Sequence, residues 1–81
     1  MRLPKDLSSD ELSDLLTKYG YQKTRQTGSH IRLTTTMNGV HHITIPAHKQ
    51  IRIVTLHSVL KDVAHHLDLE GTLFTKELLK E

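Results

Sequence analysis

Cysteine is absent from this sequence of 81 residues, and so is any long hydrophobic run. Without cysteine, neither a disulfide nor a cysteine-based zinc site can stabilise the fold, and this usage fits a reducing compartment. Without a long apolar run, no segment reads as a signal peptide or as a membrane span. We therefore expect a cytoplasmic protein that makes no use of a membrane.

Acidic residues are missing from the middle of the chain. The whole sequence has 11 Lys and Arg against 9 Asp and Glu, but the stretch from Lys18 to Arg52 contains six Lys or Arg and no acid. A positive surface in this stretch would attract phosphates, and such binding weakens with salt. An ordinary solvated sheet face explains the same pattern equally well.

The length corresponds to a single domain over residues 1–81, because no repeat, linker or low-complexity segment divides the chain. A chain of this size buries only about 60–65% of its unfolded surface, so the core is small. Aromatic residues are limited to Tyr19, Tyr21 and Phe74. Platforms for stacking unpaired bases are therefore scarce, and any recognition of RNA should depend on backbone and shape.

Residues 7–20 have the signals of an amphipathic helix. Ser8 is a good N-cap, Glu11 stands three residues later as its capping-box partner, and Leu7 with Leu12 can form a hydrophobic staple. Gly20 supplies the stop signal. The expected apolar face contains Leu12, Leu15, Leu16 and Tyr19.

Three strands are expected next, over residues 21–27, 29–36 and 40–45, with breaks at Gly28 and at Asn38-Gly39. A two-residue Asn-Gly turn would place Ile31 and Leu33 on the opposite face from Ile43 and Ile45, which would split the core. A three-residue loop over 37–39, with Gly39 left-handed as a bulge, instead pairs Leu33 with Ile43 and Ile31 with Ile45. Core burial favours this second register.

The favoured register has a consequence for function, because it separates an apolar face of the sheet from a polar one. The residues predicted to point away from the apolar face are His30, Arg32, Thr34, His42 and Thr44.

Two helices are expected after the strands, over residues 54–67 and 69–81. The apolar stripe of the first contains Leu56, Val59, Leu60, Val63 and Leu67, and that of the second contains Leu73, Phe74, Leu78 and Leu79. The predicted fold class is therefore α+β in the order α-β-β-β-α, a three-stranded antiparallel sheet with helices on one face and a short C-terminal helix.

His30 is the candidate for acid–base chemistry. An imidazole has an ordinary pKa of about 6.5, so both protonation states are available near neutral pH. As a general base it could take the proton of an RNA 2′-hydroxyl so that this oxygen attacks the adjacent phosphorus, a role worth about 10²–10⁴ in rate. The alternative is an exposed strand histidine with no chemical role.

The seven histidines do not predict a metal site. His41-His42 and His65-His66 are adjacent pairs, and neighbours on a strand or a helix diverge rather than converge on one ion. A site built from His30, His42 and one loop residue is a weaker alternative. We expect no metal.

Phosphate contacts can be nominated from the cations of the acid-free stretch. Gly28 could also let an RNA backbone approach the strand closely. The cationic candidates are Lys23, Arg25, Arg32, Lys49 and Arg52, each of which could equally be a solvated surface charge.

Several short motifs, taken in order, resemble the HicA toxins, which are small ribonucleases of bacterial toxin–antitoxin pairs. The resemblance covers residues 8–67 and leaves 68–81 as a C-terminal extension. Its markers are a short first helix ending in Gly20-Tyr21, Gly28-Ser29-His30, Ile45-Pro46-x-His48, and Thr55-Leu56 followed by Ser58-Val59-Leu60.

The resemblance implies a fold like that of double-stranded-RNA-binding domains, used to cleave mRNA without a cofactor. The histidine of Gly-Ser-His is the essential catalytic residue of the family, and it corresponds to His30. The usual partner is a HicB antitoxin, which covers this histidine. The expected substrate-binding residues are Gly28, Ser29, Lys23, Arg25, Arg32 and His48.

One position departs from the family pattern. Family members usually have Gly before the Thr-Leu that opens the second helix, where this chain has Val54. A β-branched residue disfavours a left-handed backbone, so we expect the loop 49–54 to differ from that of the family.

Two other interpretations of the chain are a non-catalytic RNA-binding module on the same fold and a protein whose sheet face binds another polypeptide.

Overall fold

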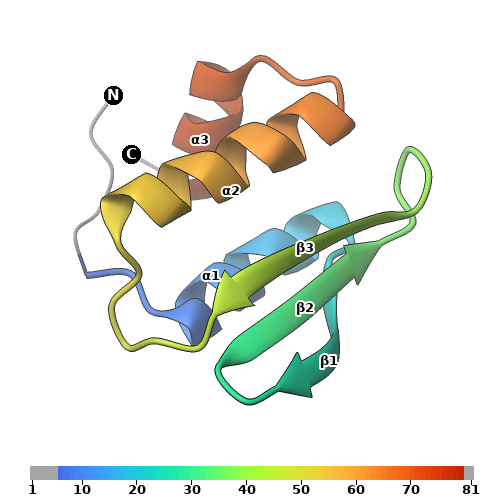
Figure 1. Cartoon of the computed structure of the whole chain (residues 1–81). Coiled ribbons are helices and arrows are strands. Elements are labelled where there is room, and N and C mark those ends of the chain that lie inside the picture. Colours follow the sequence, from blue (N-terminus) through green and yellow to red (C-terminus); the bar gives the residue numbers. More distant parts are fainter. Residues whose placement is uncertain (1–5, 80–81) are drawn as a thin grey trace.

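The computed structural model describes residues 6–79, which form a three-stranded antiparallel sheet, two helices packed on it and a third helix packed on those two (Figure 1). The order of the strands in the sheet is β1-β2-β3. The predicted α-β-β-β-α order with an added C-terminal helix is confirmed. The elements are α1 (Ser9–Leu16), a 3-10 turn η1 (Thr17–Tyr19), β1 (Gln22–Thr27), β2 (His30–Thr35), β3 (His41–Pro46), α2 (Ile53–His66) and α3 (Gly71–Leu79).

Helix α1 begins with the predicted capping box. The Ser8 hydroxyl accepts from the Glu11 backbone N–H at 3.1 Å, and the Glu11 carboxylate accepts from the Ser8 backbone N–H at 2.9 Å. The helix ends through η1 at Gly20, whose φ of 81° is left-handed. The chain therefore turns directly from α1 into the sheet.

The β2–β3 register is the one that core burial favoured, with Leu33 opposite Ile43 and Ile31 opposite Ile45. The loop is longer than predicted. The last strand pair joins Thr35 to His41, so residues 36–40 form the connection. Both Asn38 and Gly39 have positive φ, at 56° and 96°, so the left-handed conformation is shared between them and does not fall on Gly39 alone.

A single core lies between the helices and one face of the sheet, since the apolar face of β2 and β3 is buried by α1 and α2, and α3 packs on both helices. In Figure 1, α2 runs beside β3 and α1 lies behind the sheet. The fully buried side chains include Leu12, Leu16, Tyr21, Leu33, Ile45, Ile51, Leu56, Val63 and Leu78.

Helix α3 begins two residues later than expected and uses fewer of the predicted apolar residues, and the predicted positions 80 and 81 lie outside the described residues. Glu70 caps it, because its carboxylate accepts from the backbone N–H groups of Thr72 and Leu73 at 2.8 and 3.2 Å. Phe74 is buried and meets Tyr19 edge-on with ring centroids 5.0 Å apart, but Leu73 is exposed. The prediction for Leu73 was wrong because only the Phe74–Leu78 side of this helix reaches the core.

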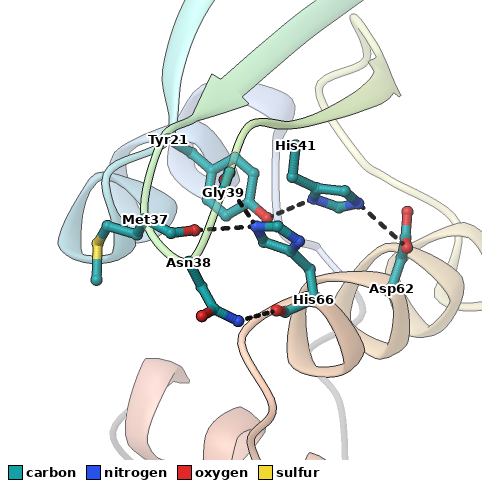
Figure 2. Close-up of polar contacts among 7 residues, drawn as sticks. All are labelled: Tyr21, Met37, Asn38, Gly39, His41, Asp62 and His66. Carbon is teal, nitrogen blue, oxygen red and sulfur yellow. Dashed lines mark hydrogen bonds and ion pairs between the residues drawn. The ribbon is translucent and has the colours of Figure 1, made fainter.

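A polar chain that starts at the buried Tyr21, just before β1, joins this residue and β3 to α2 (Figure 2). The Tyr21 hydroxyl lies 2.7 Å from His41 Nδ1, and His41 Nε2 faces Asp62 Oδ1 at 3.4 Å. Because a carboxylate only accepts, His41 in its neutral form keeps its hydrogen on Nε2 and takes the Tyr21 hydrogen bond at Nδ1. Burial, with a smaller contribution from Asp62, raises the pKa of Tyr21 to about 12.

The β2–β3 loop is fastened to the end of α2 by His66. Its Nε2–H donates to the carbonyls of Met37 and Gly39, at 2.9 and 3.1 Å, while the Asn38 amide donates to the His66 carbonyl at 2.8 Å. The His66 ring also stacks on His41, with centroids 4.2 Å apart and planes 11° apart. Figure 2 shows that these contacts and the Tyr21 chain form one cluster.

The longest helix, α2, has 14 residues. None of the helices within residues 6–79 has the length and apolar character needed to cross a bilayer.

The Gly20→Ala variant tests the turn between α1 and the sheet. A Cβ at this position would lie 2.7 Å from Thr35 Oγ1, which donates a hydrogen bond to the Tyr19 carbonyl. The left-handed backbone of residue 20 adds strain for any residue with a Cβ. We expect the free energy of unfolding to fall by about 2 kcal/mol or more. Urea denaturation followed by circular dichroism measures this.

Gly71→Ala is the matched control, because a Cβ at that position meets nothing within 4 Å. It should change stability by no more than about 0.5 kcal/mol. Equal losses in the two variants would contradict the explanation by close contact and backbone strain.

The pKa of Tyr21 predicts a loss of stability in alkali. An unfolded tyrosine ionises near pH 10 while Tyr21 stays neutral to about pH 12, so stability is complete below pH 10 and falls as the pH rises to 12. A shift of this size corresponds to roughly 2 to 3 kcal/mol. Urea midpoints measured from pH 9 to 12 should show the fall in the wild type.

The Tyr21→Phe variant is the control for other groups that titrate in the same range. Its stability should be lower at pH 9, because the hydrogen bond to His41 is lost, and should fall less between pH 10 and 12. Parallel curves for the two proteins would show that Tyr21 does not carry the pH dependence.

Candidate functional site

The face of the sheet that the helices leave open is polar, as predicted. Strand pairing arranges its side chains in three rows across the sheet, and successive rows are two residues apart along β2 and β3. The row at one end contains Thr27, His30 and Pro46, the middle row Arg25, Arg32 and Thr44, and the third row Gln22, Thr34 and His42.

A bulge in β1 decides which predicted phosphate contacts share this face. Thr24 is the extra residue, since Lys23 lies opposite Leu33 and Arg25 lies opposite Arg32. Arg25 therefore joins Arg32 on the open face. Lys23 is on the other face, so the structure does not bring it together with His30.

His30 is exposed at the start of β2, next to the turn that joins β1 to β2. Gly28, the first of the two turn residues, has a φ of 58°, and a Cβ there would meet nothing within 4 Å. Within residues 6–79 the His30 ring has no hydrogen-bond partner. Both ring nitrogens are therefore open to solvent or to a substrate.

The segment after β3 reaches the same end of the sheet. The Ser29 carbonyl accepts from the Ala47 backbone N–H at 2.7 Å, and the His48 carbonyl accepts from the Ser9 backbone N–H at 2.9 Å. Four of the predicted site residues thus lie at one end of the sheet, with Arg25 and Arg32 in the next row of the open face. These four are Gly28, Ser29, His30 and His48.

Val54 does not disturb the start of α2. The helix begins at Ile53, so Val54 is a helical residue, and its side chain is 76% exposed. Among the non-glycine residues of 6–79, only Asn38 and Asp68 have positive φ. The expected conflict between a β-branched residue and a left-handed backbone is therefore absent here, because the residue is right-handed.

A hydrogen-bonded chain on the open face was not predicted. It crosses all three strands: Thr24 Oγ1 lies 2.8 Å from Thr34 Oγ1, which lies 2.8 Å from His42 Nδ1. The sequence placed Thr34 and His42 on one face, but the Thr24 contact depends on the bulge. His42 is thus an exposed histidine held in a fixed orientation, unlike His30.

The two histidines of this face are too far apart to share one ion or one phosphorus atom. His30 is paired with Pro46 and His42 with Thr34, so four residues, or about 13 Å, separate them along the strands. No three His, Cys, Asp or Glu side chains of residues 6–79 converge as metal ligands. The alternative metal site built on His30 and His42 is therefore not formed.

The positive charge of the arginines on this face is not balanced by acidic residues of the strands. The three strands contain no Asp or Glu, and the contact of His41 with Asp62 lies on the helix side of the sheet. The Tyr21–His41–Asp62 chain also combines acid–base groups, but Tyr21 is fully buried. Its tyrosine hydroxyl is therefore not accessible to a substrate.

Comparison with known proteins supports the family resemblance that the sequence motifs indicated. Residues 9–64 match the family model described as the HicA toxin of bacterial toxin–antitoxin systems. No curated protein and no solved structure matches the chain. The matched segment covers more than half of the sequence and runs from α1 to Ala64 near the end of α2, with Gly28-Ser29-His30 inside it. The chain therefore belongs to the HicA toxin family.

Proposed function

We propose that this HicA-family toxin is an endoribonuclease that cleaves mRNA in the cytoplasm without a metal ion, with His30 as its single catalytic residue. The observation that carries the proposal is the position of His30, exposed at the end of an acid-free sheet face beside the Gly28-Ser29 turn. An RNA backbone can approach this end closely, because the space around Gly28 is open.

The chemistry requires one proton acceptor and no external reagent. A His30 ring nitrogen takes the proton of the 2′-hydroxyl, the 2′-oxygen bonds to the adjacent phosphorus, and the bond from phosphorus to the 5′-oxygen breaks. The 5′-oxygen leaves with a proton from the imidazolium or from water. The products are a 2′,3′-cyclic phosphate and a 5′-hydroxyl.

The residues proposed to contact the RNA lie at different distances from His30. Gly28, Ser29 and His48 lie at the same end of the sheet as His30, and Ser29 orients either the imidazole or the scissile group there. Arg25 and Arg32, one row away, neutralise the neighbouring phosphates. Lys23, on the other face, contributes at most to the general positive field.

A HicB-like antitoxin is the partner that the family membership suggests. Because the catalytic histidine has no partner within residues 6–79, inhibition requires another chain to cover it. We propose that the antitoxin lies over the row of His30 and the neighbouring arginine row.

Cleavage in EDTA is the decisive test of the proposed function. The wild type should cut a single-stranded RNA in EDTA, and His30→Ala should be slower by about 10²–10⁴ because the general base is lost. Gel electrophoresis of a labelled RNA gives the rates, and circular dichroism shows that both proteins are folded.

His57→Ala serves as the control, since His57 is exposed on α2 and outside the open sheet face. It should cut at the wild-type rate. A His30→Ala protein as active as the wild type would place the chemistry elsewhere. RNA binding without cleavage by the wild type would favour a non-catalytic RNA-binding module.

A further inference from the structure

We propose that His42 is a second phosphate-binding residue, which holds the RNA backbone at a fixed distance from the bond cut at His30. The inference rests on the proposed ribonuclease function and adds a binding subsite to it. It places the RNA strand along β2, from the row of His30 to the row of His42.

The hydrogen-bonded chain occupies only one ring nitrogen of His42. Nδ1 lies 2.8 Å from the Thr34 hydroxyl, so Nε2 is the nitrogen that is left for a ligand. A protonated His42 also fixes the direction of the chain, because Nδ1–H then donates to Thr34, Thr34 donates to Thr24, and the Thr24 hydroxyl is directed to the Arg32 carbonyl.

This arrangement suits an anion. When His42 is protonated, Nδ1–H keeps its bond to Thr34, and Nε2–H becomes a second donor. A phosphate at Nε2 favours the protonated ring, because an opposite charge stabilises the charged form. The imidazole does not have to reorient in order to bind, so little conformational entropy is lost.

The spacing of the rows fits a chain of phosphates. Neighbouring rows lie about 7 Å apart, since each step covers two strand residues. Arg25 and Arg32 occupy the row between His30 and His42, so cationic groups follow one another along the face without an acid among them. A polyanion following β2 therefore meets a favourable charge at each row.

The same spacing excludes His42 from the reaction at His30. The separation of about 13 Å equals roughly four stacked nucleotides at 3.4 Å each, or fewer in an extended strand. His42 therefore acts as a binding and positioning residue. Its removal should weaken binding and raise KM, while the chemical step is preserved.

Binding is tested in the His30→Ala background, so that the result does not depend on cleavage. Adding His42→Ala should weaken binding of a labelled single-stranded RNA of about twelve nucleotides roughly tenfold at pH 6, because a charged hydrogen bond is lost. The slope of log affinity against log salt should fall by about 0.7, the value for one phosphate contact on a single strand. Fluorescence anisotropy measures both quantities.

Two further variants and one control separate a binding role of His42 from a structural one. Thr34→Val, which removes the hydroxyl that orients His42 but keeps a β-branched strand residue, should lose part of the affinity. His42→Lys should restore affinity, because it returns a cation. His65→Ala, an exposed histidine on α2, should bind as the parent does. Unchanged affinity in His42→Ala would overturn the proposal.

Cleavage of designed substrates locates the subsite. An RNA with a single free 2′-hydroxyl and 2′-O-methyl groups elsewhere has one possible cut, and nucleotides can be removed from either end. For His42→Ala, KM should rise about tenfold with kcat unchanged, and the difference from wild type should vanish once one end is too short to reach His42.

The outcomes separate the two proposals. A drop in kcat with unchanged KM, or a KM effect independent of substrate length, would contradict a distant phosphate subsite while leaving His30 as the catalyst. Absence of cleavage together with His42-dependent binding would refute the ribonuclease and keep the subsite.

Discussion

The pairing of β2 with β3 decides which side chains of this small protein are available for chemistry. Leu33 opposite Ile43 and Ile31 opposite Ile45 direct four apolar side chains into the single core. Since neighbouring residues of a strand point to opposite faces, the same pairing places His30, Arg32 and His42 on the open face. A slip of one residue in β3 would move His42 to the core side and Ile43 and Ile45 into solvent, so the core and the open face depend on one register.

The cluster at the far end of the hairpin holds this pairing against α2. His66 donates hydrogen bonds to two loop carbonyls, and the Tyr21–His41–Asp62 chain joins β3 and the residue before β1 to the helix (Figure 2). These histidines are occupied by structural contacts. His30, at the opposite end of β2, has none within residues 6–79, which is the condition expected of a group that must meet a substrate.

The alternation of side chains along a strand predicts some features of the site correctly and misses others. The alternation of a strand correctly separates His41 from His42, which lie on opposite faces of β3. It does not show that His41 stacks on His66 of α2, because that contact joins residues distant in sequence. Nor does it show that Arg25, two residues after Lys23, lies on the other face, because the bulge at Thr24 reverses the alternation.

The sequence by itself determined the order of the elements, the capping box of α1, the register of the central hairpin and the family motif around His30. These features follow from local propensity and from the period of apolar residues, which are written into short stretches of chain. Only the tertiary structure decided the length of the β2–β3 loop, the side on which Arg25 lies, and the fixed orientation of His42. Each of these depends on contacts across strands or between the sheet and α2, and such contacts exist only after the chain has folded.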